Sequence, residues 1–207
     1  DADDCLGRSR TFLGSSALWP AVVNSSNSSW AAGWDMGIFG LMSADQGPLR
    51  DWSAVWFMYC DGSSFTSHTT QPLLVNGTHV HMRGRSTLRA ILDDLTATRG
   101  LAAAQTVLLA GTSSGGMACY YHAEHIRERL PATVRLLAAP DAGFFPDAPL
   151  PPGQRAFREA IKGLVTLFNI SASSSGGAYP GTNAHCVAAH AAANETWRCL
   201  FAEYALP

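Results

Sequence analysis

The chain has 207 residues, of which 47% are hydrophobic and 14% are charged, and its formal net charge is -2. This composition is typical of a folded globular chain with a sizeable core and excludes a disordered one. The near-neutral charge argues against nucleic acid or an anionic membrane as a partner. No apolar run approaches the ~18 residues that a bilayer-spanning helix needs.

The chain opens with acidic residues, Asp1-Ala-Asp-Asp4, which are unlike the basic and apolar start of a secretory leader. We therefore expect that a leader has been removed or that the chain begins inside a longer protein. Residues 1–50 combine paired glycosylation motifs with scattered glycines and tryptophans, and we expect irregular surface structure there.

Five asparagines begin the Asn-x-Ser/Thr motif that accepts N-linked glycans. One such motif is common by chance, but five in a chain of this length favour a secretory route. We therefore expect a secreted protein of the cell wall or cell surface. The five asparagines are Asn24, Asn27, Asn76, Asn169 and Asn194.

The chain has five cysteines, and a secretory route predicts that most of them form disulfides. Cys186 and Cys199 are the best internal pair, because they flank a short segment rich in Ala and Asn. The odd count implies a free thiol or a partner outside this chain, and Cys5 is the cysteine that we assign to such a partner.

Short apolar runs of strand length alternate with segments of helical periodicity. Buried strands that alternate with helices predict an α/β fold, with a mostly parallel sheet that carries helices on both faces. We expect one domain over residues 1–207. The expected order is strand 52–59, helix 84–98, strand 105–110, helix to about 130, strand 133–138, helix 157–168 and a Ser- and Gly-rich loop at 171–177.

The segment Gly111-Thr-Ser113-Ser-Gly115 matches G-x-S-x-G, and it lies between a predicted strand and a predicted helix. In such a nucleophile elbow, a sharp turn directs the serine hydroxyl outward. Glycines on either side, here Gly111 and Gly115 followed by Gly116, are expected because strand and helix approach too closely for a Cβ. The motif predicts Ser113 as a nucleophile and the Ser114 amide as an oxyanion donor.

Two roles without a catalytic serine stay open for this motif. A glycine-rich turn also lets a helix pack closely on a sheet without any catalysis. A phosphate cradle is a further alternative, although the lysine of a Walker loop is absent. The position between strand and helix favours a catalytic serine, and we predict no cofactor.

The nucleophile needs a base and an acid, which follow it in this fold in the order acid, then histidine. His122 and His125 lie on the helix that leaves the elbow, too early in the chain for that order. His185 and His190 are expected in a short loop, before any further strand. Asp141 follows the very next strand, whereas the acid of this fold normally comes later. The chain therefore offers a nucleophile without convincing partners.

Pairs of histidines raise the question of a metal site. His79 and His81 are two residues apart, and His122 and His125 are three apart. Neither pair comes with a cysteine pair, and the H-E-x-x-H motif is missing. We predict no metal site.

Further motifs follow one another along almost the whole chain. In this order they resemble the pectin acetylesterase and Notum family, and Tyr-Cys-Asp-Gly with Phe65 is closer to its plant-type pectin acetylesterases than to Notum. The motifs are Gly14-Ser-Ser16, Tyr59-Cys-Asp-Gly-Ser-Ser-Phe65, Arg83-Gly-Arg85, Leu92-Asp-Asp-Leu95, the elbow, Ala139-Pro-Asp-Ala-Gly-Phe144 and Trp197-x-Cys199 with Tyr204 and Pro207.

The resemblance implies a serine carboxylesterase of α/β-hydrolase fold in which Ser113 matches the family nucleophile. It implies removal of O-acetyl groups from an extracellular polysaccharide, with removal of a lipid acyl group from a protein as the alternative. A glycoprotein that keeps the fold without catalysis is a third hypothesis.

The resemblance also accounts for the missing partners of the serine. The family carries a Gly-Gly-Gly-Trp-Cys stretch ahead of the position of Cys5, and its triad acid and histidine lie beyond Pro207. We therefore expect a domain that is incomplete at both ends, with the remaining parts of the same protein as its partners. This chain has Thr112-Ser-Ser114 where the family has Cys-Ser-Ala, and it has Ala123 where the family has a cysteine.

Overall fold

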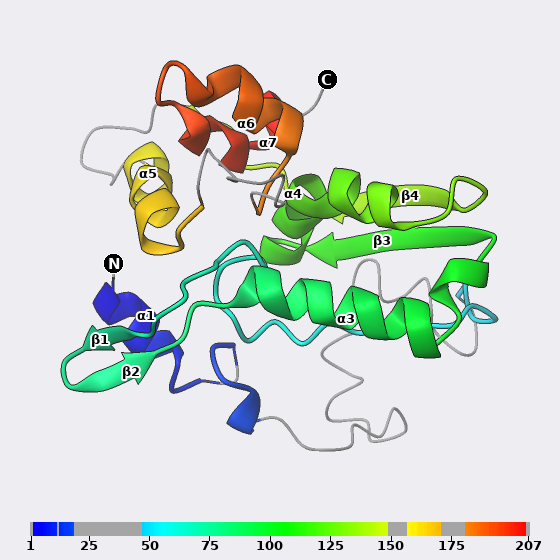
Figure 1. Ribbon diagram of the computed structural model, residues 1–207, viewed down its shortest axis with the longest axis horizontal. Coiled ribbons are helices and arrows are strands. Elements are labelled where there is room, and N and C mark those ends of the chain that lie inside the picture. Colours follow the sequence, from blue (N-terminus) through cyan, green and yellow to red (C-terminus); the bar gives the residue numbers. More distant parts are fainter. Residues whose placement is uncertain (1, 12, 19–46, 149–156, 171–180, 206–207) are drawn as a thin grey trace.

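The computed structural model describes residues 2–11, 13–18, 47–148, 157–170 and 181–205. In this part of the chain, none of the helices is long and apolar enough to cross a membrane. Figure 1 shows the arrangement of the elements. They are α1 (Ala2–Arg8), η1 (Ser16–Leu18), β1 (Leu73–Val75), β2 (Thr78–Val80), α3 (Gly84–Thr98), η3 (Leu101–Ala103), β3 (Thr106–Thr112), α4 (Ser114–Arg129), β4 (Arg135–Asp141), α5 (Phe157–Leu167), α6 (Ala184–Ala191), η4 (Thr196–Leu200) and α7 (Ala202–Ala205).

Strands β3 and β4 form a parallel pair, and α4 is the crossover between them. A parallel pair requires such a connection, so the predicted strand–helix–strand unit is confirmed. Strand β4 begins later than expected and runs through Pro140 to Asp141, rather than ending at the proline. Proline lacks the amide hydrogen, and β4 accommodates it because β4 pairs only with β3 among the described residues.

Helices α3 and α4 share one hydrophobic cluster with this parallel pair. Leu88 and Leu92, four residues apart on α3, pack with Ile126 of α4 and with Val107 of β3. On the opposite face of the sheet, Leu137 is 38% exposed. Helices α3 and α4 therefore pack on one face of the sheet, and Leu137 lies on the other.

The prediction of a strand at 52–59 is wrong. This segment forms neither helix nor strand, and both of its tryptophans are exposed. An apolar run becomes a strand only when another strand pairs with its backbone, and no described segment does so. Instead, Phe57 and Tyr59 pack edge-on against Phe65.

A β-hairpin that was not expected from the sequence lies at β1 and β2. Its turn is Asn76-Gly77, with φ angles of 47° and 76°, as a two-residue hairpin turn with left-handed backbone requires. Considering Asn76 only as a glycosylation motif misses this signal. Helix α1, in the segment expected to be irregular, contacts the hairpin, and the Asn76 side chain donates to Asp3 Oδ1 at 2.8 Å.

The C-terminal elements gather at one end of the molecule, away from the free end of the parallel pair (Figure 1). The predicted helix α5 is confirmed, with Ile161 buried on its inner face. Cys186 of α6 and Cys199 of η4 are joined by a disulfide with an S–S distance of 2.01 Å. His185 and His190 lie on α6 and not in the expected loop, because Asn183 caps a helix there by accepting from the Cys186 amide.

Three of the five glycosylation motifs fall on described residues. Asn76, Asn169 and Asn194 are all exposed, and all have positive φ angles. Outside the described residues lie Asn24, Asn27 and the loop expected at 171–177.

Candidate active site

Ser113 occupies the sharp turn between β3 and α4. Its φ and ψ angles are 57° and -117°, a conformation that costs a non-glycine residue about 1–3 kcal/mol. The Ser113 amide donates to the Asp141 carbonyl oxygen at 3.0 Å, and its own carbonyl accepts from the Met117 amide at 2.9 Å. The strained residue is thus held between β4 and the first turn of α4, and its side chain is exposed.

Two glycines permit the close approach of strand and helix at this turn. A Cβ on Gly111 would lie 2.5 Å from the Gly115 carbonyl oxygen, and one on Gly116 would lie 2.6 Å from the Asp141 carbonyl oxygen. A Cβ on Gly115 would meet open space. The expectation that Gly115 is sterically required is therefore wrong, because Gly116 is the helix residue that faces β4.

The acid at the end of β4 belongs to the frame of the elbow. The Thr112 hydroxyl donates to Asp141 Oδ2 at 2.8 Å, and the Asp141 backbone holds the Ser113 amide. Thr112, one of the departures from the family motif, thus has a structural role of its own. Both of these Asp141 contacts go to the elbow, and its exclusion from the triad stays a prediction.

The Ser114 amide begins α4, a helix of 16 residues. The first amides of a helix have no intrahelical acceptor, and the helix dipole makes this end favourable for negative charge. The part of the chain that the structure describes gives this amide no hydrogen-bond acceptor. This amide therefore remains able to donate to a group beside Ser113, and its role as an oxyanion donor stays a prediction.

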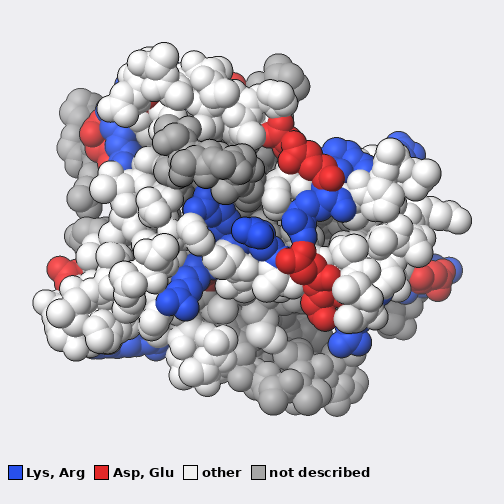
Figure 2. Space-filling model, in the orientation of Figure 1, with Lys and Arg blue, Asp and Glu red and all other residues white. Residues whose placement is uncertain are grey.

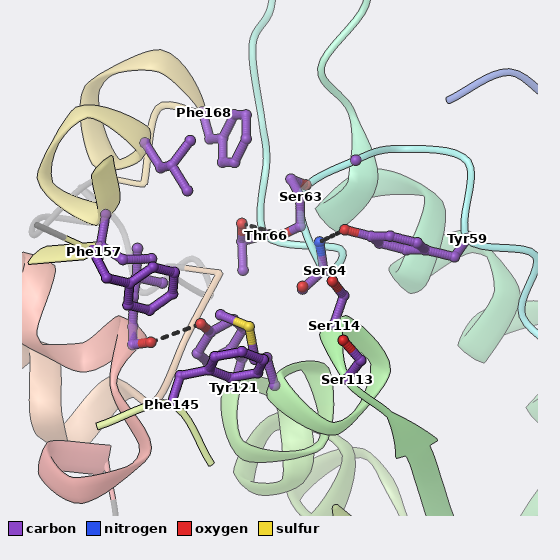
Figure 3. A pocket seen from close by; sticks show the side chains of 15 residues that line it. Tyr59, Ser63, Ser64, Thr66, Ser113, Ser114, Tyr121, Phe145, Phe157 and Phe168 are labelled. Atoms are coloured by element: carbon purple, nitrogen blue, oxygen red, sulfur yellow. Dashed lines mark hydrogen bonds between the residues drawn. The ribbon is translucent and has the colours of Figure 1, made fainter. Parts of the chain in front are cut away.

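A cavity of about 290 Å³ opens beside Ser113 and has two chemically different ends. Figure 3 shows hydroxyl groups around Ser113 on one side and aromatic and aliphatic side chains on the other. The polar end is lined by Tyr59, Ser63, Ser64, Thr66, Ser113 and Ser114, and the apolar end by Met117, Tyr121, Phe145, Phe157, Ile161, Leu164, Phe168 and Leu200.

The polar wall is a tight loop over residues 61–66. Its carboxylate, Asp61 Oδ2, accepts from the Ser63 and Phe65 amides, each at 3.2 Å, and from the Ser63 hydroxyl. Ser64 and Phe65 have φ angles of 51° and 61°, which are unusual for residues with side chains. Burial raises the pKa of Asp61, and its Oδ1 has no partner among the described residues.

His122 ties this loop to the nucleophile helix. Its Nε2 lies 2.7 Å from the Ser64 carbonyl oxygen, so the ring donates through Nε2–H. Burial lowers the pKa of His122 to about 4, which keeps the ring neutral in ordinary conditions. On the other side of Ser64, its amide donates to the Tyr59 hydroxyl at 3.2 Å. The loop facing Ser113 is therefore fixed from both sides.

The apolar end is assembled from segments that are distant in the sequence. Tyr121 of α4 donates through its hydroxyl to the Leu200 carbonyl oxygen at 2.7 Å, which fixes η4 to the nucleophile helix. Phe157 stacks with Phe145 and meets Phe201 edge-on, so α5 is packed onto the same core. These contacts place α5 as the outer wall of the cavity (Figure 3).

None of the described residues that line the cavity is a histidine, an aspartate or a glutamate. His122 is engaged with Ser64, and His185 lies 3.0 Å from a Glu124 oxygen with its side chain 91% exposed. His190 packs against Tyr204. A base for Ser113 from outside this chain therefore stays a prediction. Among the described residues, no three potential ligands gather to hold a metal ion.

The sequence and the fold are similar to those of known proteins. The family model described as Pectinacetylesterase matches residues 1–207. The chain belongs to the pectinacetylesterase family. Pectin acetylesterase 11 of Arabidopsis thaliana is 34% identical over 149 residues, which are 70% of this chain and 34% of that protein. Pectin acetylesterase 5 of the same plant is 30% identical over 172 residues, which are 82% of this chain and 37% of that protein.

Solved structures show the same fold. Two crystal structures of the Wnt deacylase Notum from Drosophila match the whole of this pectinacetylesterase-family chain, with TM-scores of 0.74 and 0.70 and identities of 21% and 22%. At this identity the likeness concerns the fold, and the α/β-hydrolase prediction is confirmed. The chain covers 56% of one Notum chain and about a third of the plant relatives.

Sequence reasoning missed most of the cavity wall of this family member. Tyr59, Ser63 and Ser64 belong to the Tyr-Cys-Asp-Gly-Ser-Ser-Phe motif, which carried the resemblance but received no structural role. The Gly and Ser residues that follow Asp61 are a turn signal that would have placed a loop there. His122 was considered only as a base or a metal ligand, and nothing local in the sequence indicates its hydrogen bond to Ser64.

Proposed function

We propose that this chain carries the nucleophile of a secreted serine carboxylesterase that removes O-acetyl groups from an extracellular polysaccharide. The observation that carries the proposal is Ser113, held in a strained elbow with its side chain exposed at the polar end of a cavity. The relatives named pectin acetylesterases support this substrate class. The assignment of residues 1–207 to one domain stays a prediction.

The chemistry follows from the placement of two groups. Ser113 Oγ attacks the acetyl carbon, and the Ser114 amide donates to the oxygen that becomes negative. The bond from the acyl carbon to the sugar oxygen then breaks, and the sugar hydroxyl leaves with the proton that Ser113 gave up. Water hydrolyses the acyl-enzyme to acetate. Both proton transfers need a base, which we place in a part of the protein outside the described cavity lining.

A second candidate is removal of a longer acyl chain; the Notum neighbours are named Wnt deacylases. The observation in its favour is the apolar end of the cavity, whose lining includes Phe157, Ile161 and Phe168. A fatty acyl chain gains from burial against such side chains, at ~0.8 kcal/mol per CH₂ group. A series of p-nitrophenyl esters of increasing chain length separates the two activities.

We also propose that the protein passes through a secretory route. Asn76, Asn169 and Asn194 are exposed in glycosylation motifs, and a disulfide joins Cys186 to Cys199. Disulfides persist mainly in oxidising compartments. Treatment of the natively expressed protein with a peptide N-glycosidase tests this proposal, because a glycosylated protein loses mass.

The test of the esterase proposal is hydrolysis of p-nitrophenyl acetate and of acetylated pectin by the natively purified protein. Ser113→Ala is expected to lower kcat by roughly a thousandfold or more, because the acyl acceptor is lost. Ser114→Ala is the matched control, because it removes a neighbouring hydroxyl but keeps the backbone amide. Turnover that survives Ser113→Ala would exclude this nucleophile.

A further inference from the structure

The cavity beside Ser113 offers no charged side chain to a ligand. Charged side chains of both signs lie on the outer surface, where Figure 2 shows them gathered across the middle of one face. None of the described residues that line the cavity is charged, and its polar end consists of hydroxyl groups and backbone. A ligand is therefore held at the polar end by hydrogen bonds to neutral groups.

Two of the hydroxyl groups in the loop over residues 61–66 are used within the loop itself. The Ser63 hydroxyl donates to Asp61 Oδ2 and accepts from the Ser67 amide at 3.0 Å. The Thr66 hydroxyl donates to the Ser63 carbonyl oxygen at 2.7 Å. These two hydroxyl groups stabilise the loop and have no proton left to donate to a ligand.

The hydroxyl group of Ser64 is not used in this way. Ser64 is 5% exposed and lines the cavity, but its hydroxyl has no hydrogen-bond partner in the part of the chain that the structure describes. Only its backbone is engaged, through the Tyr59 hydroxyl at 3.2 Å and His122 Nε2 at 2.7 Å. A hydroxyl group in so buried a residue is expected to have a partner, and the cavity is the side from which one can come.

The backbone at Ser64 supports the same conclusion. Its φ angle is 51°, in the left-handed region that glycine adopts without a steric cost. A glycine would satisfy this turn with less strain, as Gly62 does in the same loop with a φ angle of 70°. The turn alone therefore does not require a serine, whereas a ligand that binds the serine hydroxyl does.

The two ends of the cavity suit the two parts of a sugar ester. The hydroxyl groups at the polar end can exchange hydrogen bonds with the alcohol part, whose carbons carry further hydroxyl groups, and the apolar lining suits the acyl part. Figure 3 shows Ser64 with Ser113 on one side of the cavity and Phe157 on the other. An ester bound at Ser113 with its acyl part toward the apolar lining therefore has its alcohol part on the side of Ser64.

We propose that Ser64 determines specificity by binding a free hydroxyl group on the carbon next to the ester, as a partly acetylated sugar presents it. The inference rests on the proposed esterase function and specifies the alcohol part of its substrate. The Ser64 hydroxyl can donate to that group or accept from it. Tyr59 and His122 are positioning residues, because they hold the Ser64 backbone from both sides. An ester without the neighbouring hydroxyl leaves Ser64 without a partner and is the poorer substrate.

The test compares two esters that differ by one hydroxyl group, trans-2-hydroxycyclohexyl acetate and cyclohexyl acetate. The natively purified protein should prefer the first. Ser64→Gly removes the hydroxyl group and accepts the positive φ angle without strain. In this variant the ratio of the two kcat/KM values is expected to fall about fivefold to tenfold, which is the contribution of one neutral hydrogen bond. Ser64→Ala should give a similar fall.

Ser63→Ala is the matched control, because it removes a hydroxyl group that is used within the loop. It should lower the turnover of both esters by the same factor. An equal fall of the ratio in this control would assign the effect to the shape of the loop and overturn the role of Ser64. An unchanged ratio in both Ser64 variants, while turnover still depends on Ser113, would also overturn it.

Failure of the esterase proposal gives a different result, because neither ester is then turned over. Saturation-transfer NMR of the same two esters on the Ser113→Ala protein decides the role of Ser64 in that case. Stronger binding of the hydroxylated ester that is lost in Ser113→Ala/Ser64→Gly would support the proposal. Equal binding of the two esters would overturn it.

Discussion

The two ends of the cavity are built by different means. The polar end depends on backbone geometry, with positive φ angles at Ser64, Phe65 and Ser113 and with hydrogen bonds that fix each of them. The apolar end depends on side-chain packing across α4, α5 and η4. Backbone geometry of this kind has few substitutes, whereas packed side chains can be exchanged for others of similar volume. We therefore expect the polar end to tolerate few substitutions and the apolar end to tolerate exchanges between side chains of similar volume.

The largest expected effect comes from adding one carbon to the elbow. Gly116→Ala is expected to lower the free energy of unfolding by about 3 kcal/mol and to reduce esterase activity, because its Cβ would lie against the Asp141 carbonyl oxygen. Thermal or urea unfolding measures the first effect. Gly115→Ala is the control, because its Cβ meets open space and alanine favours a helix. Equal destabilisation by both would contradict the account of the elbow.

Lowering the pH should destabilise the fold at the polar end of the cavity, because His122 is neutral there. Its pKa is lowered to about 4 in the fold, against an ordinary value of 6.5, by burial first and then by the charges of His125 and Arg85. Between these pH values the unfolded chain binds a proton that the folded chain does not. The free energy of unfolding should therefore fall by about 3 kcal/mol as pH drops from 6.5 to 4.

Other groups titrate in the same range, so the comparison needs a variant. His125 and His68 also have lowered pKa values and add to the loss, whereas the raised pKa of Asp61 opposes it. His122→Gln keeps a side-chain N–H but removes the titration. Unfolding measured at several pH values should give this variant a shallower loss toward pH 4. Parallel curves for the two proteins would rule out the assignment to His122.

The same position tests whether the hydrogen bond to Ser64 orders the polar end. His122→Leu removes the donor and leaves a buried carbonyl unpaired, which costs about 1–3 kcal/mol. We expect kcat to fall in this variant and to be restored toward the wild-type value in His122→Gln. His122 acts here by positioning the loop. Rescue by glutamine distinguishes that role from a proton-transfer role, because an amide cannot act as a base.

The two ends of the cavity also differ in how well the sequence predicts them. The elbow was predictable, because a local motif between a strand and a helix determines its geometry, although the steric role belongs to Gly116 rather than Gly115. The apolar end was not, because Phe145, Phe157 and Leu200 meet only through tertiary packing. The failed strand at 52–59 has the same cause, since strand formation depends on a distant partner.

The smallest effect should come from the apolar end and concern selectivity. Leu164 is a half-buried cavity residue on α5, and Leu164→Phe adds volume to the apolar lining of the cavity. We expect kcat/KM for p-nitrophenyl octanoate to fall about tenfold relative to that for the acetate, since pocket fit is worth about 1–3 kcal/mol. Thr166→Phe, at an exposed position of the same helix, should leave the ratio unchanged. A ratio that stays constant in Leu164→Phe would mean that acyl groups do not enter the apolar end. The support for the longer-chain activity would then be lost, and acetate would remain as the acyl group that this site accommodates.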